Sequence, residues 1–380
     1  MCSTKQSDRS CIVLTINSGS TSVKLAAFEA GPGQAVTEVS RTSLKGEGLE
    51  PQAALAGFLA QLPARPDVIA HRIVHGGRRF TAPVRIDPAV TTAIGELSEL
   101  APLHNPKALE WVEAASRISG TNVVQVAVFD TAFFASLPRV AAEYALARRY
   151  GIDEGVRRYG FHGLAHEALW MRWSQLHPNL PRGGRVITLQ MGGGVSAAAI
   201  DRGKPLDTSM GFSPLEGLVM ATRSGDVDPA IIPYLQRRLG KSADEIVELL
   251  NRESGVAGVS GLGTNLGELA ADPSPQAQFA VDLYCYRLRK YVGAYLAVLG
   301  GCEGIVFGGG VGEHVPAVRQ RILAGMTWAG IEIDAQANDA AVGREARIDT
   351  LKLPVEVHVI PVEEEHVLVD AALAVYTPAR

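Results

Sequence analysis

Two stretches of the chain share one pattern, and this repeat limits the fold more than any other feature of the sequence. Residues 12–31 (IVLTINSGSTSVKLAAFEAG) and residues 186–203 (VITLQMGGGVSAAAIDRG) each read as an apolar strand, a glycine-containing turn, a second strand, an acidic residue and a glycine. A repeat near the start of each half predicts two similarly folded domains, whose two turns could hold one polyphosphate across a cleft. Chance similarity between two hairpins is the alternative.

A chain of 380 residues also favours two domains over one core. Apolar strand-like runs alternate with helix-like segments, which predicts a mixed α/β architecture. Expected strands cover residues 12–16, 23–28, 68–74, 123–129, 185–190, 196–200, 304–307 and 355–360, and expected helices cover 52–61, 105–118, 242–251, 276–299 and 315–325. Ser242 followed by Glu245 fits a capping box at the start of one of these helices.

The first turn, INSGSTSVK at residues 16–24, carries groups that suit a phosphate. Backbone N–H groups near a glycine, side-chain donors and a point charge together form an anion site. The donors are Asn17, Ser18, Ser20, Thr21, Ser22 and Lys24. A serine-rich surface hairpin is the other interpretation of this stretch taken alone.

A third glycine cluster occurs in IVFGGGVGEHVPAVRQRI at residues 305–322. We expect a strand ending at Phe307, a turn through Gly308, Gly309, Gly310 and Gly312, and a helix from near Val315. Such a turn lets backbone amides approach a phosphate or nucleoside, although many glycine-rich turns are only tight connections.

Charge and composition exclude several classes of protein. The formal net charge of -4 argues against a general nucleic-acid binder. No apolar run reaches the length of a membrane span, and the polar N-terminus lacks the apolar core of a signal peptide. The four cysteines follow no metal-ligand spacing, which favours a reducing compartment. We therefore expect a cytoplasmic protein without a nucleic-acid or membrane partner.

Short polar segments carry the candidate chemistry. Arg72 lies in an apolar strand run and Arg223 in a Gly/Ser-rich turn, where each could offer a guanidinium fork to an anion. Asp130 ends an apolar strand, a position where α/β proteins place functional carboxylates. His162 follows an aromatic residue and precedes a glycine. Taken singly, His75 and His104 are better explained as structural histidines, and Asp207 and Asp226 as turn or cap residues.

Nine motifs in order resemble the acetate kinase (acetokinase) family of the actin, sugar-kinase and Hsp70 ATPase superfamily. They are INSGSTSVK, HRIVHGG, LAPLHNP, FDTAF, RRYGFHG, DTSMGFSPLEGL, TRSGDVDPAI, GGGVGE and VIPVEEE. The resemblance implies an α/β fold of duplicated ribonuclease-H-like (actin/Hsp70 ATPase-type) domains facing across a catalytic cleft, in a homodimer. The implied domains are 1–134 plus 366–380, with the acyl substrate and first phosphate turn, and 135–365, with the nucleotide and the dimer contact.

The resemblance also implies an activity, transfer of the γ-phosphoryl group of ATP to a short carboxylate to give an acyl phosphate and ADP. Catalytic roles fall to Asp130, His162 and Arg223, and substrate binding to Arg72 with an apolar pocket of Val74, Leu103, Phe161 and Pro214. Mg²⁺, with Mn²⁺ as a substitute, would be held by Asn17 and Glu364. Nucleotide contacts fall to Lys24, Gln190, Met191, Gly192, Gly193, Gly194, Asn265, Leu266, Gly267, Gly310, Val311, Gly312, Glu313 and His314. Acetate is expected to be the best acceptor and propionate the second, since Val74 stands where propionate-preferring members tend to carry alanine.

Departures from the family pattern concentrate on the nucleotide side. Gln190 and Gly193 replace the His and Asn of the usual HLGNG, and Asn265 and Gly267 replace an Asp and an Arg that approach the nucleoside. His314 replaces an Asn. The donor is therefore less determined than the acceptor. Pyrophosphate or another nucleotide as donor is one alternative, and a non-catalytic paralogue that binds nucleotide or acyl phosphate is another.

Overall fold

The computed structural model describes residues 10–19, 22–31, 35–46, 49–120 and 123–376. The chain divides into two compact units, Met1–Phe133 with Glu364–Arg380, and Phe134–Glu363. The sequence predicted domain boundaries after residues 134 and 365, whereas the units of the structure change after residues 133 and 363. The shift of the second boundary moves Glu364 from one unit to the other. Glu364 belongs with the first unit, because the helix that it begins packs on that unit's sheet.

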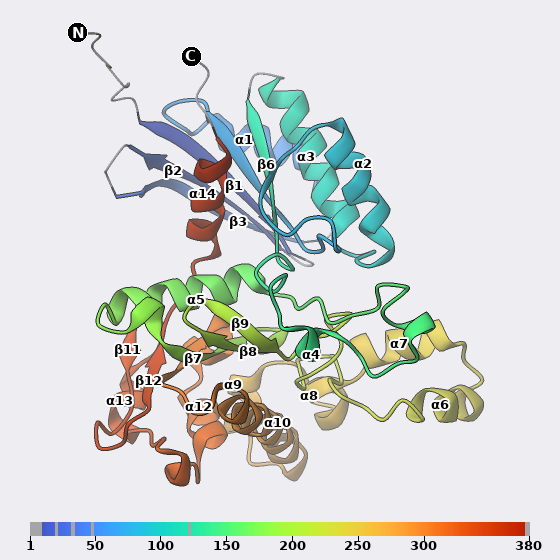
Figure 1. The fold of residues 1–380 in the computed structure, drawn as a ribbon, viewed down its shortest axis with the longest axis vertical. Helices are drawn as coiled ribbons and strands as arrows, with labels where there is room; N and C mark the ends of the chain where they lie inside the picture. Colours follow the sequence, from blue (N-terminus) through green and yellow to red (C-terminus); the bar gives the residue numbers. More distant parts are fainter. Residues whose placement is uncertain (1–9, 20–21, 32–34, 47–48, 121–122, 377–380) are drawn as a thin grey trace. The chain divides into compact units, whose positions relative to one another are not determined.

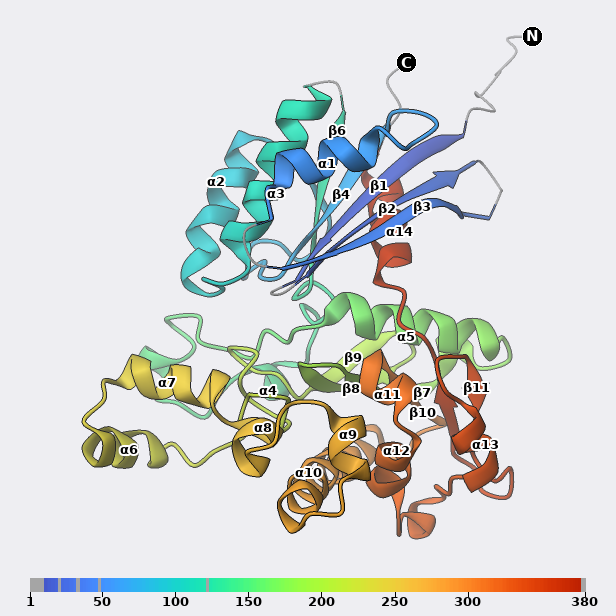
Figure 2. The same cartoon turned by 180° about the vertical axis from the view of Figure 1, so that it is seen from behind.

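Unit 1 is built on a mixed six-stranded sheet (Figure 1). Its order is β3-β2-β1-β4-β6-β5, in which β1, β4 and β6 are parallel, whereas the pairs β1/β2, β2/β3 and β5/β6 are antiparallel. Helices α1 and α3 cover one face, and α14 covers the other (Figures 1 and 2). The elements are β1 Cys11–Ser18, β2 Ser22–Ala30, β3 Thr37–Lys45, α1 Pro51–Leu59, β4 Val68–Ile73, β5 Val84–Arg85, α2 Pro88–Glu96, α3 Asn105–Ser119, β6 Val124–Phe129 and α14 Glu364–Val375.

Alternation along β1 explains how this unit separates its core from its polar groups. Leu14 and Ile16 pack in a cluster with Leu55 of α1 and Trp111 of α3. Successive side chains of a strand point to opposite faces, so Asn17 lies on the face that α14 covers. Every residue of β1 from Ile12 to Ser18 is buried, which explains its nearly continuous apolar sequence.

Unit 2 repeats this topology and confirms the internal duplication. Its sheet order β9-β8-β7-β10-β12-β11 matches that of unit 1 strand for strand, with the same pattern of parallel and antiparallel neighbours. Helix α5 covers one face and α10 the other (Figure 1). The elements are α4 Arg139–Ala142, α5 Gly163–Leu176, β7 Arg185–Met191, β8 Val195–Asp201, β9 Lys204–Thr208, α6 Ile231–Leu239, α7 Ala243–Arg252, α8 Gly255–Ser260, α9 Leu266–Ala271, α10 Pro275–Leu299, β10 Gly304–Gly308, α11 Gly309–His314, α12 Pro316–Leu323, α13 Ala335–Ala340, β11 Ala346–Arg347 and β12 Glu356–Val359.

The glycine cluster after β10 differs from its expected form. It is not a turn before a helix at Val315, because α11 already begins at Gly309 and α12 follows at Pro316. Gly309 has a φ of +76°, and a Cβ there would lie 2.8 Å from the Met191 carbonyl oxygen. Glycine thus serves close packing of α11 against the end of β7. The capping box of Ser242 and Glu245 is confirmed at the start of α7.

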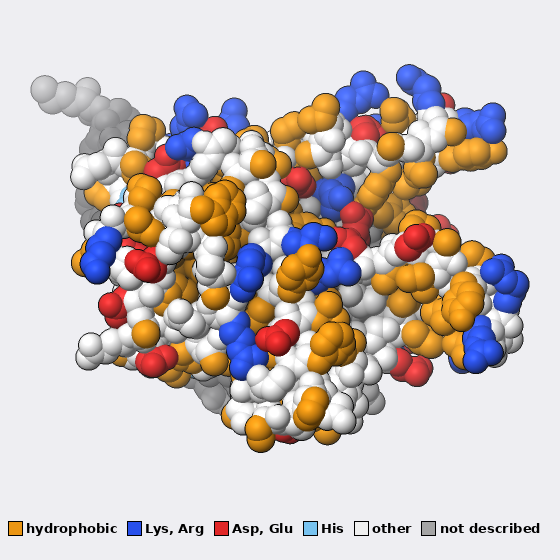
Figure 3. Space-filling model, turned by 90° about the horizontal axis from the view of Figure 1, so that it is seen from below, with side chains coloured by type: hydrophobic (Ala, Val, Ile, Leu, Met, Phe, Trp, Pro, Cys, Tyr) orange, Lys and Arg blue, Asp and Glu red, His pale blue; other side chains and the backbone are white. Residues whose placement is uncertain are grey.

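The surface mixes side-chain types. Figure 3 shows hydrophobic, basic and acidic side chains interspersed on the face drawn, without an extended field of one charge. Among the described residues, no helix combines the length and the apolar character needed to cross a membrane.

Candidate functional site

Four polar side chains of unit 1 meet at one edge of its sheet. Asn17 lies at the end of β1, Arg72 near the end of β4, and Asp130 directly after β6. These three strands are parallel neighbours, so their carboxyl ends meet at one edge, where open α/β sheets bind ligands. Glu364 reaches the same place from the first turn of α14. We call these four residues the Arg72 cluster.

Arg72 is the centre of this cluster. Its Nε and Nη2 donate to Oδ1 and Oδ2 of Asp130 at 3.0 and 2.7 Å, a bidentate pair that fixes the guanidinium plane. Its Nη1 donates to Asn17 Oδ1 at 3.0 Å and lies 3.4 Å from Glu364 Oε2. Burial alone would lower the pKa of Arg72, but the charges of Asp130 and Glu364 outweigh it and raise that pKa above its ordinary value.

Asn17 links the cluster to α14. Its Nδ2 donates to Glu364 Oε2 at 2.7 Å and to Glu365 Oε1 at 3.2 Å. Lys24, which is paired with Asn17 across β1 and β2, places its Nζ 3.6 Å from Glu365 Oε1, and its side chain is 42% exposed. Ser20 and Thr21, the hydroxyl residues expected to help this turn bind phosphate, lie outside the described residues.

The oxygen donors of the Arg72 cluster suit a hard divalent cation. Carboxylate and amide oxygens are the ligands that Mg²⁺ accepts, and it usually takes only one or two carboxylates from the protein. Glu364 and Asp130 supply carboxylates, and Asn17 an amide oxygen, all at one sheet edge. The residues expected to hold Mg²⁺ thus fit it in chemistry.

The residues expected to form the apolar acyl pocket differ in exposure. In unit 1, Val74 is buried just beyond β4, whereas Leu103 is 57% exposed. In unit 2, Phe161 is buried beside His162 and Pro214 is half-buried in the loop after β9. Each unit therefore carries part of this expected set.

In unit 2, His162 belongs to a chain of hydrogen-bonded polar groups. Its Nδ1 lies 2.8 Å from Ser196 Oγ, which lies 2.8 Å from Nε2 of His166. His166 Nδ1 in turn contacts Thr188 Oγ1 at 2.7 Å. His162 is the residue before α5 and has a φ of +57°, a conformation uncommon outside glycine that occurs at functional sites.

Arg223 lies beside His162 at the turn between β7 and β8. A Cβ on Gly194 would lie 3.2 Å from His162 Nε2 and 3.6 Å from Arg223 Nη1, so the missing side chain lets both approach the turn. Arg223 Nη1 donates to the Pro214 carbonyl oxygen at 3.1 Å. Among the described residues it has no carboxylate partner, and burial lowers its pKa. A partly buried guanidinium with no counter-ion favours binding of an anion.

Apart from Lys24 of unit 1, the residues expected to face the nucleotide lie in unit 2, where the side chains of Glu313 and Asn265 have structural hydrogen bonds. The turn at Gly192–Gly194 is tied to the Arg223 loop by the Ala221 N–H, which donates to the Gly193 carbonyl at 3.1 Å. Helix α11 packs on β7 and α9 packs on α11, so Gly310–His314 and Asn265–Gly267 join this turn. Glu313 accepts from the backbone N–H groups of Gly309 and Val362.

Asn265 is the N-cap of α9, so its side-chain oxygen is engaged in hydrogen bonds with the helix backbone. Its Oδ1 accepts from the N–H groups of Gly267 and Glu268 at 3.0 and 3.4 Å. Leu266 is buried, which leaves only its backbone for a ligand. Gln190 Oε1 is buried and has no hydrogen-bond partner in the described part of the chain.

Comparison with known proteins agrees with the motifs. The profile of the acetokinase family matches residues 58–370. The chain belongs to the acetokinase family. Acetate kinase of Chloroherpeton thalassium is 46% identical over 305 residues, covering 79% of this chain and 73% of that protein. The acetate kinase structure from Porphyromonas gingivalis superposes with a TM-score of 0.86 at 36% identity, covering 96% of this chain and 99% of that one.

A further acetokinase relative has a different acceptor in its name. The structure of a propionate kinase from Francisella tularensis superposes with a TM-score of 0.85 at 31% identity, covering 96% of this chain and 100% of the other. These superpositions extend over both units and confirm the expected fold class, two duplicated ribonuclease-H-like α/β domains of the actin and Hsp70 ATPase type.

Sequence reasoning missed the residues that support the acetokinase loop carrying Pro214 and Arg223. Arg158 Nη2 donates to Glu216 Oε1 at 2.6 Å, and Tyr144 OH bonds the other oxygen of that carboxylate. Tyr144 OH also accepts from the Phe212 N–H at 2.8 Å. Arg158 and Glu216 lie inside two of the motifs quoted above, and this position was the signal that could have identified them. No sequence signal marks Ser196 and His166, because their partners are distant in sequence.

Proposed function

We propose that this acetokinase transfers the γ-phosphoryl group of ATP to acetate, reversibly, giving acetyl phosphate and ADP, with propionate as the second acceptor. The observation that carries the proposal is Arg223, a partly buried guanidinium beside His162 and the Gly194 turn that lacks a carboxylate partner in the described chain. The family membership and the similarity to acetate and propionate kinases support the reaction class.

The acceptor in this reaction needs no general base. A carboxylate with an ordinary pKa of about 4 is already ionised at neutral pH. The barrier instead comes from bringing one anion against another, which fixed cations and oriented donors reduce. We assign Arg72 to the acceptor carboxylate and Asp130 to orienting Arg72, as their bidentate pair supports.

On the phosphoryl side, Arg223 and His162 have the charge and donors to stabilise the transferring group. Val74, Leu103, Phe161 and Pro214 are assigned to the acceptor's alkyl end. One methylene in an apolar pocket changes binding by only about 1–3 kcal/mol, so preference for acetate over propionate should be modest.

Asn17 and Glu364 would hold Mg²⁺, with Mn²⁺ as a substitute, through side-chain oxygens. The bound cation would neutralise phosphate charge. Lys24 is assigned to a nucleotide phosphate, because it pairs with Asn17 across β1 and β2 and its side chain is 42% exposed.

We assign the nucleotide to the Gln190–Gly194 turn, α11 and the start of α9. Gly267 has no guanidinium to lay against a nucleoside, a contact worth roughly 0.5–2 kcal/mol. We therefore expect the protein to bind the adenine base weakly. Contacts between the nucleotide phosphates and backbone amides do not depend on this side chain and should remain.

One assay tests both reaction and donor. Acyl phosphate, trapped as the hydroxamate, is measured for acetate, propionate and butyrate with ATP, GTP and pyrophosphate. We expect activity with ATP and acetate, and weak discrimination between ATP and GTP. Activity with pyrophosphate but with neither nucleotide would refute ATP as the donor. Absence of acyl phosphate with every acceptor and donor would refute the proposed kinase activity.

Within this assay Arg223→Ala should lose on the order of 10³-fold or more in kcat, since an arginine that stabilises transferring phosphoryl charge contributes that much. Arg223→Lys should recover little, because lysine lacks the planar fork. Arg237→Ala, which removes an arginine from the exposed helix α6, is the matched control. A folded Arg223→Ala protein with near-normal kcat would contradict the role.

We further propose a cytoplasmic homodimer. The free thiols of Cys11, Cys285 and Cys302 suit a reducing compartment. On α10, Phe279 and Tyr286 are 62% and 57% exposed and stand one heptad apart, which suits a subunit contact. Light scattering after size-exclusion chromatography should give twice the chain mass, and a chain-mass value would refute the dimer.

A further inference from the structure

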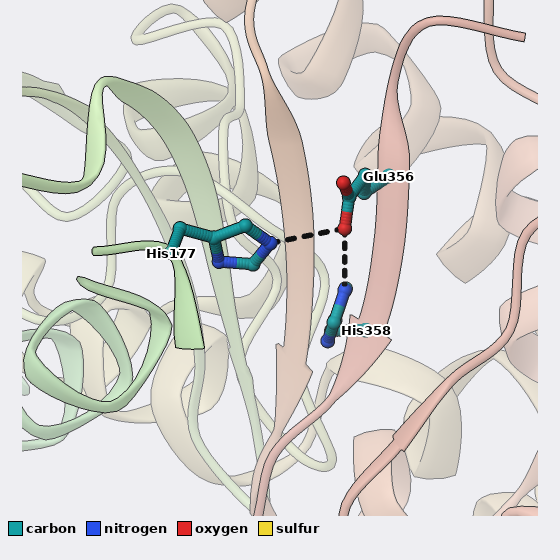
Figure 4. A group of neighbouring side chains, drawn as sticks. All are labelled: His177, Glu356 and His358. Carbon is teal, nitrogen blue, oxygen red and sulfur yellow. Dashed lines mark hydrogen bonds and ion pairs between the residues drawn. The ribbon is translucent and has the colours of Figure 1, made fainter. Parts of the chain in front are cut away.

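Two histidines and a glutamate converge in unit 2 outside the residues assigned to phosphoryl transfer. His177 is the C-cap of α5, directly after its last residue, whereas Glu356 and His358 are the first and third residues of β12 (Figure 4). Residues two apart on a strand share a face, so both side chains of β12 point toward His177. His177 Nε2 and His358 Nε2 each lie 3.0 Å from the same atom, Glu356 Oε2.

We propose that His177, Glu356 and His358 form a binding site for a transition-metal dication of the zinc class. All three ligand atoms lie within 4.8 Å of one another. Metal–ligand bonds of about 2.0–2.2 Å in tetrahedral geometry place ligand atoms roughly 3.3–3.5 Å apart. Small side-chain adjustments therefore suffice, and a water molecule would complete the coordination.

The hydrogen bond on the far side of His177 orients its ring for metal binding. Nδ1 lies 2.8 Å from the Trp173 carbonyl oxygen, which can only accept, so Nδ1 carries a proton. In the neutral ring Nε2 then presents its lone pair to Glu356 Oε2. A metal ion between Nε2 and Oε2 would satisfy both lone pairs, as a proton on Nε2 also would, and a backbone carbonyl behind a metal-ligating histidine is a usual arrangement.

The second oxygen of Glu356 is held elsewhere. Arg347 Nη1 lies 3.0 Å from Glu356 Oε1, while Arg347 is itself anchored on Asp349. This leaves Oε2 for the ion. The Glu356 side chain is 26% exposed, which gives an ion access, whereas those of His177 and His358 are 14% and 9% exposed.

The donor set selects the class of metal. Imidazole nitrogen suits zinc, cobalt and nickel, whereas magnesium prefers oxygen ligands alone. The ion would tie the C-terminal end of α5 to β12 within unit 2, and so stabilise the folded unit in proportion to occupancy.

The test uses the untagged full-length chain after chelator treatment, with millimolar Mg²⁺ present throughout to occupy oxygen-only sites. Zinc is titrated in competition with a chromophoric chelator, and Co²⁺ is added separately as a spectroscopic probe. We expect one zinc per chain, a rise in melting temperature with zinc, and the strong visible absorption of four-coordinate cobalt.

Glu356→Gln and His177→Gln should each weaken zinc binding on the order of 100-fold, since loss even of an outer-shell partner costs 10- to 100-fold. His314→Gln, which removes an exposed histidine outside the cluster, should bind zinc as the parent chain does. Absence of stoichiometric zinc and of the cobalt bands in the parent chain would overturn the site, whether or not the variants fold. Unchanged zinc affinity in both folded variants would also refute the metal site. The three side chains would then form only a hydrogen-bonded cluster.

Discussion

The two arginines assigned to the reaction, Arg72 and Arg223, differ in their charged neighbours. This difference agrees with the roles that we propose for them. Arg72 is held on three sides by Asp130, Asn17 and Glu364, which keeps its guanidinium fixed and charged. Arg223 contacts only neutral acceptors among the described residues. A guanidinium without a counter-ion leaves its charge available to an anion, which suits the proposed role of Arg223 on the phosphoryl group, whereas Arg72 in its proposed role would add one carboxylate to those already present.

At the same scale, we expect Ser196 to position His162. Its hydroxyl has one proton and lies 2.8 Å from a nitrogen of both His162 and His166, so it fixes the tautomer of one through the other. Ser196→Ala removes a hydrogen bond worth about 1–1.5 kcal/mol, and kcat should fall roughly 5- to 12-fold with an altered pH profile.

Thr188→Val serves as the control for this prediction, because Thr188 contacts His166 and reaches His162 only through two further groups. Its kcat should fall less than that of Ser196→Ala. The kcat of both variants is measured between pH 6 and 9. An unchanged pH profile and kcat in Ser196→Ala would show that the serine only fills space.

Among the elements, helix α9 offers the clearest test of the proposed nucleotide site. It is a six-residue helix capped by Asn265, and it packs on α11 and α12. Asn265→Ala removes its cap, which costs about 1 kcal/mol of stability. Because α9 adjoins the proposed nucleotide region, we expect the KM for ATP to rise several-fold while kcat changes little.

Ser242→Ala supplies the matched comparison. Ser242 caps α7 through Glu245, as Asn265 caps α9, so the loss of stability should be similar. Melting temperature and ATP kinetics are measured on both variants. If the KM for ATP rises equally in both, the effect comes from general destabilisation and α9 has no part in nucleotide binding.

For the whole molecule, two buried histidines in unit 1 predict acid sensitivity. Burial lowers the pKa of His71 to about 4, although its hydrogen bond to Gln125 opposes the shift, and burial likewise lowers the pKa of His75 to about 4. Below the ordinary value of about 6.5 the unfolded chain takes up protons that the folded chain refuses. Stability present above pH 6.5 is therefore lost as the pH falls toward 4.

Each histidine contributes a slope of up to about 1.4 kcal/mol per pH unit in that window. Urea unfolding of the full chain between pH 7 and pH 4.5 should show a falling midpoint. His71→Gln should reduce the slope, whereas His314→Gln, at an exposed position, should not. A midpoint that stays constant across this range would refute the prediction.

Local patterns in the sequence predicted eight strands, five helices and the duplication, whereas β3, β9 and α5 were not predicted. Apolar runs marked the strands, and the Ser242–Glu245 pair marked the start of a helix, because these signals act between residues near in sequence. The motifs also singled out Arg72, Asp130, His162 and Arg223, the residues to which we assign roles in the proposed reaction. The grouping of Glu364 with unit 1 was missed, since α14 joins that sheet from the other end of the chain.

Only the tertiary structure decided which side chains meet. Arg72 and Glu364 are 292 residues apart in sequence, and His177 and Glu356 are 179 apart. Such pairs depend on strand order and register, which no local pattern encodes. The same holds for Ser196, which is an ordinary serine in the sequence and becomes the link between two histidines only because β8 lies beneath α5. The sequence by itself determined which residues can do chemistry, and the packing of the sheets decided what each one touches.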